Sequence, residues 1–136
     1  MEAAATAGFD VETDVRFTSD GVAVLVHDEQ ATKGLDCGGR SIRVSRTTWA
    51  DLDRYCHSKP TAKDPAEYPV PRLDATLEGI AAASEDVDVF LQIKTTQTAE
   101  QRREFLDAPA RHGLRDRTVV TASRLDWLEA VKTASR

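Results

Sequence analysis

Residues 9–17 constrain the fold most, because apolar and charged side chains alternate along this stretch. The odd-numbered positions are apolar except for Thr13, and the four even-numbered positions are charged: Asp10, Glu12, Asp14 and Arg16. Successive side chains of a β-strand point to opposite faces, so the pattern predicts a strand with one apolar and one charged face. Residues 18–21 have the sequence Thr-Ser-Asp-Gly, which is typical of a tight turn. Residues 22–26 are all apolar and predict a second, buried strand.

Strands and helices alternate in the second half of the chain. Buried strands are predicted at residues 87–93 and 119–122. Apolar spacing, capping residues and glycine stop signals predict helices at residues 1–7, 49–57, 74–84, 98–112 and 125–134. Pro109 is expected to kink or shorten the fourth of these helices. The order of elements predicts an α/β fold built from parallel βα units.

An insertion follows the second predicted strand, at about residues 29–71. Residues 29–47 are polar and contain glycines, which indicates a long loop with a short strand at residues 42–44. Residues 58–71 contain four prolines and are expected to form another loop. The helix at residues 49–57 lies between the two loops.

The composition excludes several classes of protein. A chain of 136 residues has the size of one domain, and 40% hydrophobic residues are too many for a disordered chain. The net charge of −5 argues against binding to nucleic acid or to an anionic membrane surface. No apolar run approaches the roughly 18 residues that span a bilayer, and the first nine residues do not form a signal peptide. We expect a cytoplasmic protein as the chain stands, or an extracellular one if an upstream segment is missing.

Glu12 and Asp14 are the first candidate site residues, because their side chains leave the same face of the predicted strand. Neighbouring carboxylates repel each other in a partly desolvated site, and a hard cation such as Mg²⁺ or Ca²⁺ removes that conflict. A solvated strand face is the alternative. Arg16 lies on the same face and either balances these charges or contacts a phosphate.

Two further candidates follow predicted strands. His27 comes directly after residues 22–26 and precedes Asp28, which can fix the imidazole tautomer. Lys94 follows residues 87–93 and can meet a phosphate. A strand-end histidine in water and a solvated surface lysine are the alternatives. Ligands of α/β proteins bind at the carboxyl ends of strands, so the positions of His27 and Lys94 favour a role in ligand binding or catalysis.

The residues around this motif also resemble a known family. Residues 8–28 contain Gly-Phe-Asp-Val-Glu-Thr-Asp-Val, then Thr-Ser-Asp-Gly, then His-Asp. They resemble the glycerophosphodiester phosphodiesterases, whose signature is Gly-x-Asp-x-Glu-x-Asp-Val, Thr-x-Asp-Gly and His-Asp. Residues 71–77 look like the start of a family helix, residues 91–94 stand where the family has a strand ending in Glu-Ile-Lys, and residues 119–123 resemble its next strand. The resemblance runs from the first residue to the last and implies a (β/α)₈ barrel of the TIM type.

The resemblance also implies a function. Family members use a divalent cation to hydrolyse small glycerophosphodiesters to glycerol 3-phosphate and an alcohol, in phospholipid metabolism. By position, Glu12 and Asp14 are the expected metal ligands. His27 is an expected acid–base catalyst, and Lys94 is expected to face the phosphate or the metal. Gln92 stands where the family has a third carboxylate ligand, and its amide oxygen can still coordinate Mg²⁺ or Ca²⁺ without adding charge.

The family's opening His-Arg-Gly strand and Pro-Glu-Asn-Thr helix do not occur in this sequence, and a complete barrel needs about 250 residues. We therefore expect residues 1–136 to form one partial barrel domain of a truncated member that lacks the C-terminal half. Its open sheet edges predict marginal stability or self-association. The isolated chain is expected to be inactive or nearly so. The alternative is a non-catalytic remnant that binds a metal or a phosphodiester and needs a partner chain.

Cys37 and Cys56 lie within the insertion. They form a disulfide if the protein is exported, as some family members are, or they stay reduced in a cytosol. The sequence leaves both states open.

Overall fold

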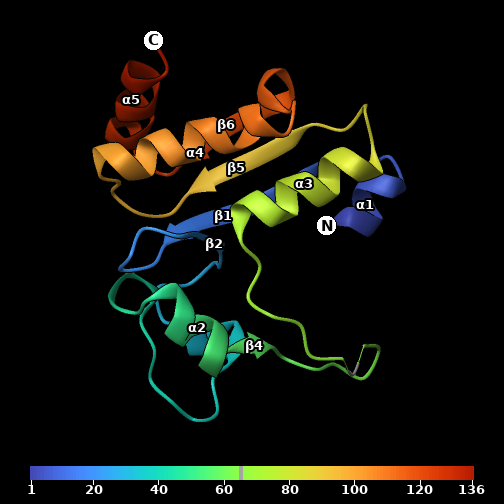
Figure 1. Cartoon of the computed structure of the whole chain (residues 1–136), viewed down its shortest axis with the longest axis vertical. Coiled ribbons are helices and arrows are strands. Elements are labelled where there is room, and N and C mark those ends of the chain that lie inside the picture. The colour runs from blue at the N-terminus through green and yellow to red at the C-terminus, as the bar shows by residue number, and fades with distance from the viewer. Residues whose placement is uncertain (65) are drawn as a thin grey trace.

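The computed structural model describes residues 1–64 and 66–136. Its largest element is a four-stranded sheet in the order β2-β1-β5-β6, made of β1 (Val11–Phe17), β2 (Ala23–Leu25), β5 (Val89–Ile93) and β6 (Thr118–Ala122). β1, β5 and β6 run parallel, and β2 returns antiparallel to β1 (Figure 1). The predicted α/β fold with parallel βα units is confirmed. One proline of the loop expected at residues 58–71, Pro65, lies outside the described residues.

Four α-helices pack against one face of this sheet: α1 (Glu2–Thr6), α3 (Leu73–Ala83), α4 (Ala99–Arg111) and α5 (Leu125–Ala134). A 3₁₀ helix, η3 (Arg115–Arg117), leads into β6. The largest fully buried side chains of this main core are Val15, Leu73, Leu77, Ile80, Val87, Leu91, Ile93, Phe105 and Leu114. None of the helices in the described part of the chain is long and apolar enough to cross a membrane.

Local sequence signals set the ends of these helices. α1 ends before Gly8, whose φ of +79° is a conformation that favours glycine. α4 begins with a capping box, in which the Thr98 hydroxyl accepts from the Gln101 N–H at 3.2 Å and the Gln101 side chain accepts from the Thr98 N–H at 2.9 Å. Pro109 lies in the last turn of α4, which ends at Arg111, one residue before the expected limit.

The other face of the sheet carries the charged residues of β1. Across β1 and β5 the register pairs Glu12 with Phe90 and Asp14 with Gln92. Phe90 in turn pairs with Val119 of β6, which is 43% exposed. Side chains at paired positions of neighbouring strands point to the same side of a sheet. This face therefore has an apolar row beside Glu12 and a polar row beside Asp14.

The start of β1 differs from its prediction. The alternating pattern predicts Phe9 on the apolar face of the strand, but this side chain is 67% exposed and β1 begins only at Val11. The Phe9 N–H donates to the Ala4 carbonyl at 3.0 Å, so Phe9 belongs to the end of α1 and precedes the ladder. β2 is also shorter than the predicted residues 22–26.

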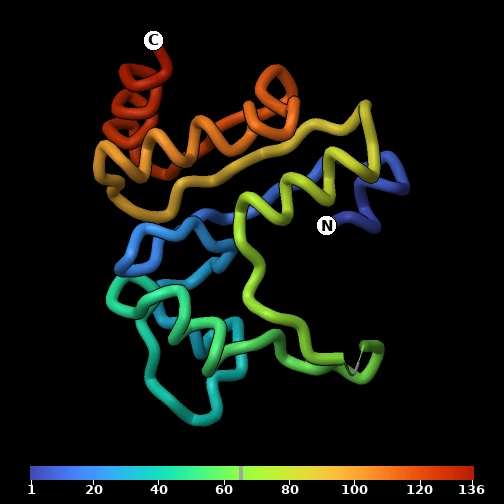
Figure 2. Tube along the Cα trace, in the orientation of Figure 1, coloured from blue at the N-terminus to red at the C-terminus, as the bar shows by residue number. Residues whose placement is uncertain are grey.

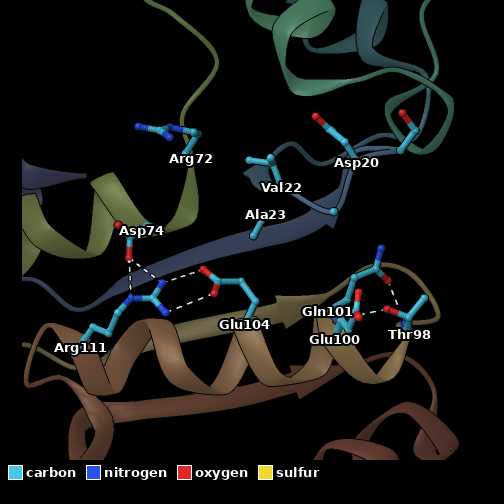
Figure 3. A pocket seen from close by; sticks show the side chains of 12 residues that line it. Asp20, Val22, Ala23, Arg72, Asp74, Thr98, Glu100, Gln101, Glu104 and Arg111 are labelled. Carbon is cyan, nitrogen blue, oxygen red and sulfur yellow. Dashed lines mark hydrogen bonds and ion pairs between the residues drawn. The ribbon is translucent and has the colours of Figure 1, made fainter.

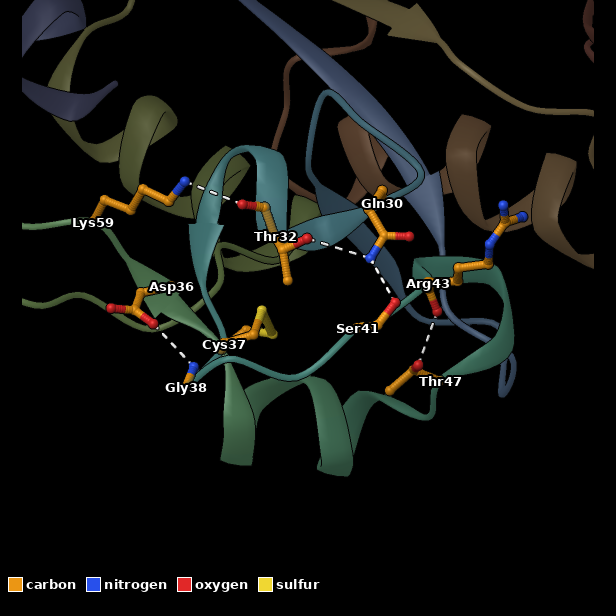
Figure 4. Close-up of a disulfide and its surroundings, with 10 residues drawn as sticks. Gln30, Thr32, Asp36, Cys37, Gly38, Ser41, Arg43, Thr47 and Lys59 are labelled. Atoms are coloured by element: carbon orange, nitrogen blue, oxygen red, sulfur yellow. Dashed lines mark hydrogen bonds between the residues drawn. A yellow bond between two sulfur atoms is a disulfide. The ribbon is translucent and has the colours of Figure 1, made fainter.

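The insertion after β2 forms a second, smaller core (Figures 1 and 2). Its elements are η1 (Ala31–Lys33), β3 (Leu35–Asp36), η2 (Val44–Arg46), α2 (Trp49–Tyr55) and β4 (His57–Ser58). The buried side chains of this insertion core are Val24, Val26, Ala31, Cys37, Ile42, Val44, Leu52, Cys56 and Val70. Cys37 and Cys56 form a disulfide within it (Figure 4).

The short strand predicted at residues 42–44 is wrong. Val44 begins η2, and the ladder of the insertion joins β3 to β4 instead. Ile42 and Val44 are both buried in the insertion core, and Arg43 between them makes an isolated bridge to Gln30. Their alternation with polar neighbours therefore reflects burial in a small core, because the single bridge at Arg43 does not extend into a strand.

β2 takes part in both cores. Ala23 and Leu25 are buried in the main core, whereas Val24 and Val26 are buried in the insertion core. Neighbouring side chains of a strand point to opposite faces, so a strand that is buried on both faces has to be apolar throughout. This explains why residues 22–26 contain no polar side chain.

Candidate active site

An ion pair joins the charged face of β1 to the end of β5. Lys94 Nζ lies 3.1 Å from Asp14 Oδ1, and the two side chains are only 21% and 18% exposed. The Lys94 N–H also donates to the Val15 carbonyl at 3.3 Å, which fixes the lysine main chain beside β1. The parallel register thus brings together two predicted site residues that are far apart in the sequence.

Glu12 and Gln92 lie on the same sheet face as this ion pair. Glu12 is exposed, and Gln92 is half-buried beside Asp14. Hard divalent cations bind about six to eight oxygen atoms, so two carboxylates and one amide oxygen fit part of such a ligand set. Within residues 1–64 and 66–136, no three His, Cys, Asp or Glu side chains gather closely enough to hold a metal ion together.

Arg16 directs its guanidinium toward the segment that follows β2. Its Nε donates to the His27 carbonyl at 3.0 Å, and its Nη1 lies 3.4 Å from Glu29 Oε2. The Arg16 side chain is 14% exposed. Arg16 therefore contacts the main chain of another predicted site residue and one carboxylate of the insertion.

His27 presents its imidazole to solvent, with 68% of the side chain exposed. Its Nδ1 lies 3.4 Å from Asp28 Oδ2, which is long for a hydrogen bond. A small molecule can therefore reach the ring.

The turn between β1 and β2 anchors the insertion. The Thr18 hydroxyl donates to the Asp20 carboxylate at 2.6 Å, and the same carboxylate accepts from the Trp49 N–H at the start of α2 at 2.9 Å. The hydrogen bond from Thr18, followed by that from Trp49, holds the pKa of Asp20 below its usual range. Sequence reasoning identified the turn but gave Asp20 no role, because its contact with Trp49 is long-range.

A cavity of about 640 Å³ lies between this turn, the start of α3 and α4 (Figure 3). In it, Arg111 Nη2 lies 2.8 Å from Asp74 Oδ1 and 2.6 Å from Glu104 Oε1. His112, which does not line the cavity, has its Nε2 3.0 Å from Asp74 Oδ1. Hydrogen bonds from Arg111 and then His112 lower the pKa of Asp74. The predicted site residues do not line this cavity, whose charged groups join α3 to α4.

The parallel strands with helices packed on one face form part of a (β/α) barrel. Residues 1–129 match the Glycerophosphoryl diester phosphodiesterase family. The chain therefore belongs to this family, and the resemblance based on residues 8–28 is confirmed.

Known proteins agree with this assignment. A Mycobacterium tuberculosis protein named "Probable glycerophosphodiester phosphodiesterase 2" is 35% identical over 101 residues, which are 74% of this chain and 33% of that protein. The crystal structure of glycerophosphodiester phosphodiesterase from Agrobacterium tumefaciens matches with a TM-score of 0.75 at 21% identity, covering 97% of this chain and 53% of that one. An Oleispira antarctica phosphodiesterase in complex with sn-glycerol-3-phosphate matches with a TM-score of 0.76 at 19% identity, covering 97% and 53%. The chain thus spans a third to about half of these relatives, and the expected partial barrel fold is confirmed.

Proposed function

We propose that the chain is part of an enzyme that hydrolyses glycerophosphodiesters to glycerol 3-phosphate and an alcohol, in phospholipid metabolism. The observation that carries this proposal is the pairing of Asp14 with Lys94 at 3.1 Å, on the same sheet face as Glu12 and Gln92. Family membership and the Oleispira phosphodiesterase that holds sn-glycerol-3-phosphate support the substrate class.

The two cationic side chains are suited to bind the phosphodiester. Lys94 is held on β1 by Asp14, so its ammonium is fixed at the carboxyl end of β5 and can contact a phosphate oxygen. Arg16 lies on the same strand as Asp14, and its guanidinium already contacts the His27 carbonyl and Glu29, so a phosphate would have to bind one of its remaining N–H groups. Fixed positive charges stabilise the negative charge that develops on the phosphoryl oxygens during hydrolysis.

His27 is proposed to transfer the proton that the leaving alcohol requires. Histidine titrates near neutral pH, so it can donate a proton to an alkoxide and take one from water under the same conditions. The exposed ring leaves room for the substrate. Asp28 is close enough to favour one tautomer, although the contact is long.

Glu12, Asp14 and Gln92 are the residues that would hold the cation, which we propose to be Mg²⁺ or Ca²⁺. Their oxygen atoms are of the type these ions prefer. When bound, such an ion neutralises phosphate charge and polarises the phosphorus. Gln92 contributes no charge, so we expect weaker cation binding than a third carboxylate would give.

The test measures glycerol 3-phosphate released from glycerophosphocholine by the 136-residue chain with Mg²⁺ or Ca²⁺. If the chain hydrolyses the substrate, His27→Ala should lower the rate at least about 100-fold, the usual contribution of a general acid. His57→Ala is the matched control, because His57 lies on β4 in the insertion and is paired with Glu67. A rate that His27→Ala leaves unchanged would remove the role proposed for this residue.

A second candidate function is a non-catalytic unit that binds a cation or a phosphodiester and acts with a partner chain. The position of β6 at the edge of the sheet favours it, because an edge strand has backbone groups free to pair with another chain. Calorimetric titration with Mg²⁺ or Ca²⁺ separates the two functions. Cation uptake that Glu12→Gln weakens, without hydrolysis, would support the second function.

We infer an extracellular compartment from the cysteine pair. Disulfides persist in oxidising environments and are rare in a cytosol. Of the two locations considered from the sequence, the Cys37–Cys56 bond supports the extracellular one over the cytoplasmic one. Mass spectrometry of the purified protein under non-reducing conditions measures whether the bond is present.

A further inference from the structure

Glu29 connects the insertion to the charged face of β1. One carboxylate oxygen, Oε1, accepts from the Ser45 N–H at 3.2 Å and from the Ser45 hydroxyl, and the Glu29 carbonyl accepts from the Val44 N–H at 3.0 Å. The other oxygen, Oε2, lies 3.4 Å from Arg16 Nη1. The two oxygens of a single carboxylate thus bind different parts of the chain, η2 on one side and β1 on the other.

Arg16 extends this connection to His27. Its Nε donates to the His27 carbonyl at 3.0 Å while its Nη1 faces Glu29. The hydrogen bond to the His27 carbonyl and the longer contact with Glu29 together orient the plane of the guanidinium, because its N–H donors have a rigid geometry. Ser45, Glu29, Arg16 and the His27 main chain therefore form one continuous chain of polar contacts.

The position of this series of polar contacts, from Ser45 to the His27 main chain, suggests a role beyond stability. Ion pairs near a protein surface contribute little to stability, so the pair of Arg16 with Glu29 alone would stabilise the fold only slightly. The Arg16 side chain, however, is only 14% exposed and holds the backbone of a residue whose imidazole has one long side-chain contact, to Asp28. A small displacement of the His27 backbone would therefore move the ring directly.

We propose that Glu29 is a positioning residue for His27, which acts by holding the Arg16 guanidinium on the His27 carbonyl. The inference rests on the proposed function, in which His27 transfers a proton. It makes the insertion, through Ser45, a part of the site that it borders. Sequence reasoning gave Glu29 no role, because its partners Arg16 and Ser45 are distant in the sequence.

The first test is independent of activity. The His27 ring and main-chain signals are followed by NMR in the full chain, in Glu29→Gln, in Arg16→Lys and in the double variant. Both single variants should shift the His27 signals, and the double variant should shift them no further than the larger single change, because the two residues act in series. Glu129→Gln, an exposed glutamate on α5, is the matched control and should leave His27 unchanged.

Additive shifts, or His27 signals that Glu29→Gln leaves in place, would overturn the proposal. The signals of insertion residues in the same spectra report whether the insertion stays folded. If Glu29→Gln unfolds the insertion, the His27 signals of Arg16→Lys and Glu29→Asp are compared instead. Glu29→Asp keeps the negative charge but shortens the side chain that contacts Arg16, so it should still shift the His27 signals. Arg16→Lys without any effect on His27 would also contradict the proposed chain of contacts.

The second test uses hydrolysis of glycerophosphocholine. Glu29→Gln should lower kcat by roughly 10- to 100-fold, the size expected when a catalytic group is displaced by about 1 Å, with KM nearly unchanged. A loss seen only in KM would assign Glu29 to substrate binding instead. If the wild-type chain shows no hydrolysis while the NMR coupling is present, the proposed function fails but the contact chain stands. Hydrolysis without the NMR coupling would refute the positioning role alone.

Discussion

The two cores of this molecule are stabilised in different ways. The main core packs strands against four helices and buries large side chains, among them Phe105, Leu77 and Ile80. Among the described residues, the insertion core buries nine mostly small side chains, with Trp49 and Tyr55 packed against them, and is crossed by a disulfide. Its contacts with the rest of the molecule include the hydrogen bond that the Trp49 N–H donates to Asp20 of the hairpin turn and the ion pair of Glu29 with Arg16 of β1. Apolar burial thus dominates in one region, and a covalent bond with polar contacts in the other.

This difference has a consequence for the candidate site. Asp14 lies on β1 and Lys94 directly follows β5, two strands of the main core, so their geometry depends on packing. His27 follows β2 and is held through Arg16 and Glu29, so its geometry depends on the insertion. We expect perturbations of the two cores to affect these two halves of the site separately.

The largest effect is expected in the main core. Phe105→Ala removes a side chain that is 1% exposed, which should lower the free energy of unfolding by about 3–5 kcal/mol through lost burial and a cavity. Urea denaturation followed by circular dichroism measures it. Leu125→Ala is the control, because Leu125 is 70% exposed and its replacement should change little. A small effect of Phe105→Ala would mean that α4 does not depend on the sheet.

Loss of the disulfide should have the second largest effect, and a local one. The bond closes a loop with a sequence separation of 19 residues, for which chain entropy predicts about 3 kcal/mol. In a double Cys37→Ala, Cys56→Ala variant, amides of α2 should lose protection from hydrogen exchange while those of β5 keep it. Equal loss in both elements would show that the two cores unfold as one unit.

The third effect concerns Asp20, whose carboxylate accepts from the Trp49 N–H at the start of α2, and it depends on pH. The pKa of Asp20 is lowered from 3.8 in the folded state, so its carboxylate contributes stability above pH 3.8 that is lost as the pH falls through the folded pKa. Asp20→Asn should lower the free energy of unfolding by about 1 kcal/mol at neutral pH, as loss of a cap does. Below pH 3.8 the difference from wild type should shrink.

Urea denaturation at both pH values tests this prediction. Asp74, whose pKa is also lowered, lies on α3 in the main region and stays intact in both proteins, so it cancels in the comparison. A difference between wild type and Asp20→Asn that stays constant with pH would assign the effect to the shape of the side chain and not to its charge.

The smallest change in stability is expected at the sheet edge. Val119→Lys alters a 43% exposed side chain of β6, so the free energy of unfolding should change by less than about 0.5 kcal/mol. Self-association should nevertheless decrease, because charged side chains protect edge strands from pairing. Sedimentation velocity measures it, with Leu125→Lys on α5 as the control. Unchanged association in Val119→Lys would exclude β6 as the contact edge.

Local patterns predicted most of the main region. The alternation in residues 11–17, the helical spacing of α3 and the capping box at Thr98 are properties of short segments, and each element formed where they indicated. The strand predicted at residues 42–44 was wrong, because burial in a small core produces the same alternation of apolar and polar residues as a strand. The prediction that Phe9 lies on the apolar face of the strand was also wrong, because Phe9 is bonded to the end of α1 and precedes the strand ladder.

The candidate site could be predicted only as a set of residues. The charged face of β1 identified Asp14 and strand ends identified Lys94 and His27, and the parallel register then placed Asp14 and Lys94 in contact. The sequence could not indicate that Arg16 contacts the His27 carbonyl or that Glu29 contacts Arg16. Those contacts depend on the path of the insertion, which no local periodicity determines.

β2 lies between the two cores and contributes buried side chains to both. Its odd-numbered side chains, Ala23 and Leu25, serve one core, and its even-numbered neighbours, Val24 and Val26, serve the other. A slip of one residue against β1 would exchange the two sets and misplace both at once. The pairing of Val15 with Leu25 therefore determines both how β2 packs against the helices on one side and where the insertion that carries Glu29 lies on the other.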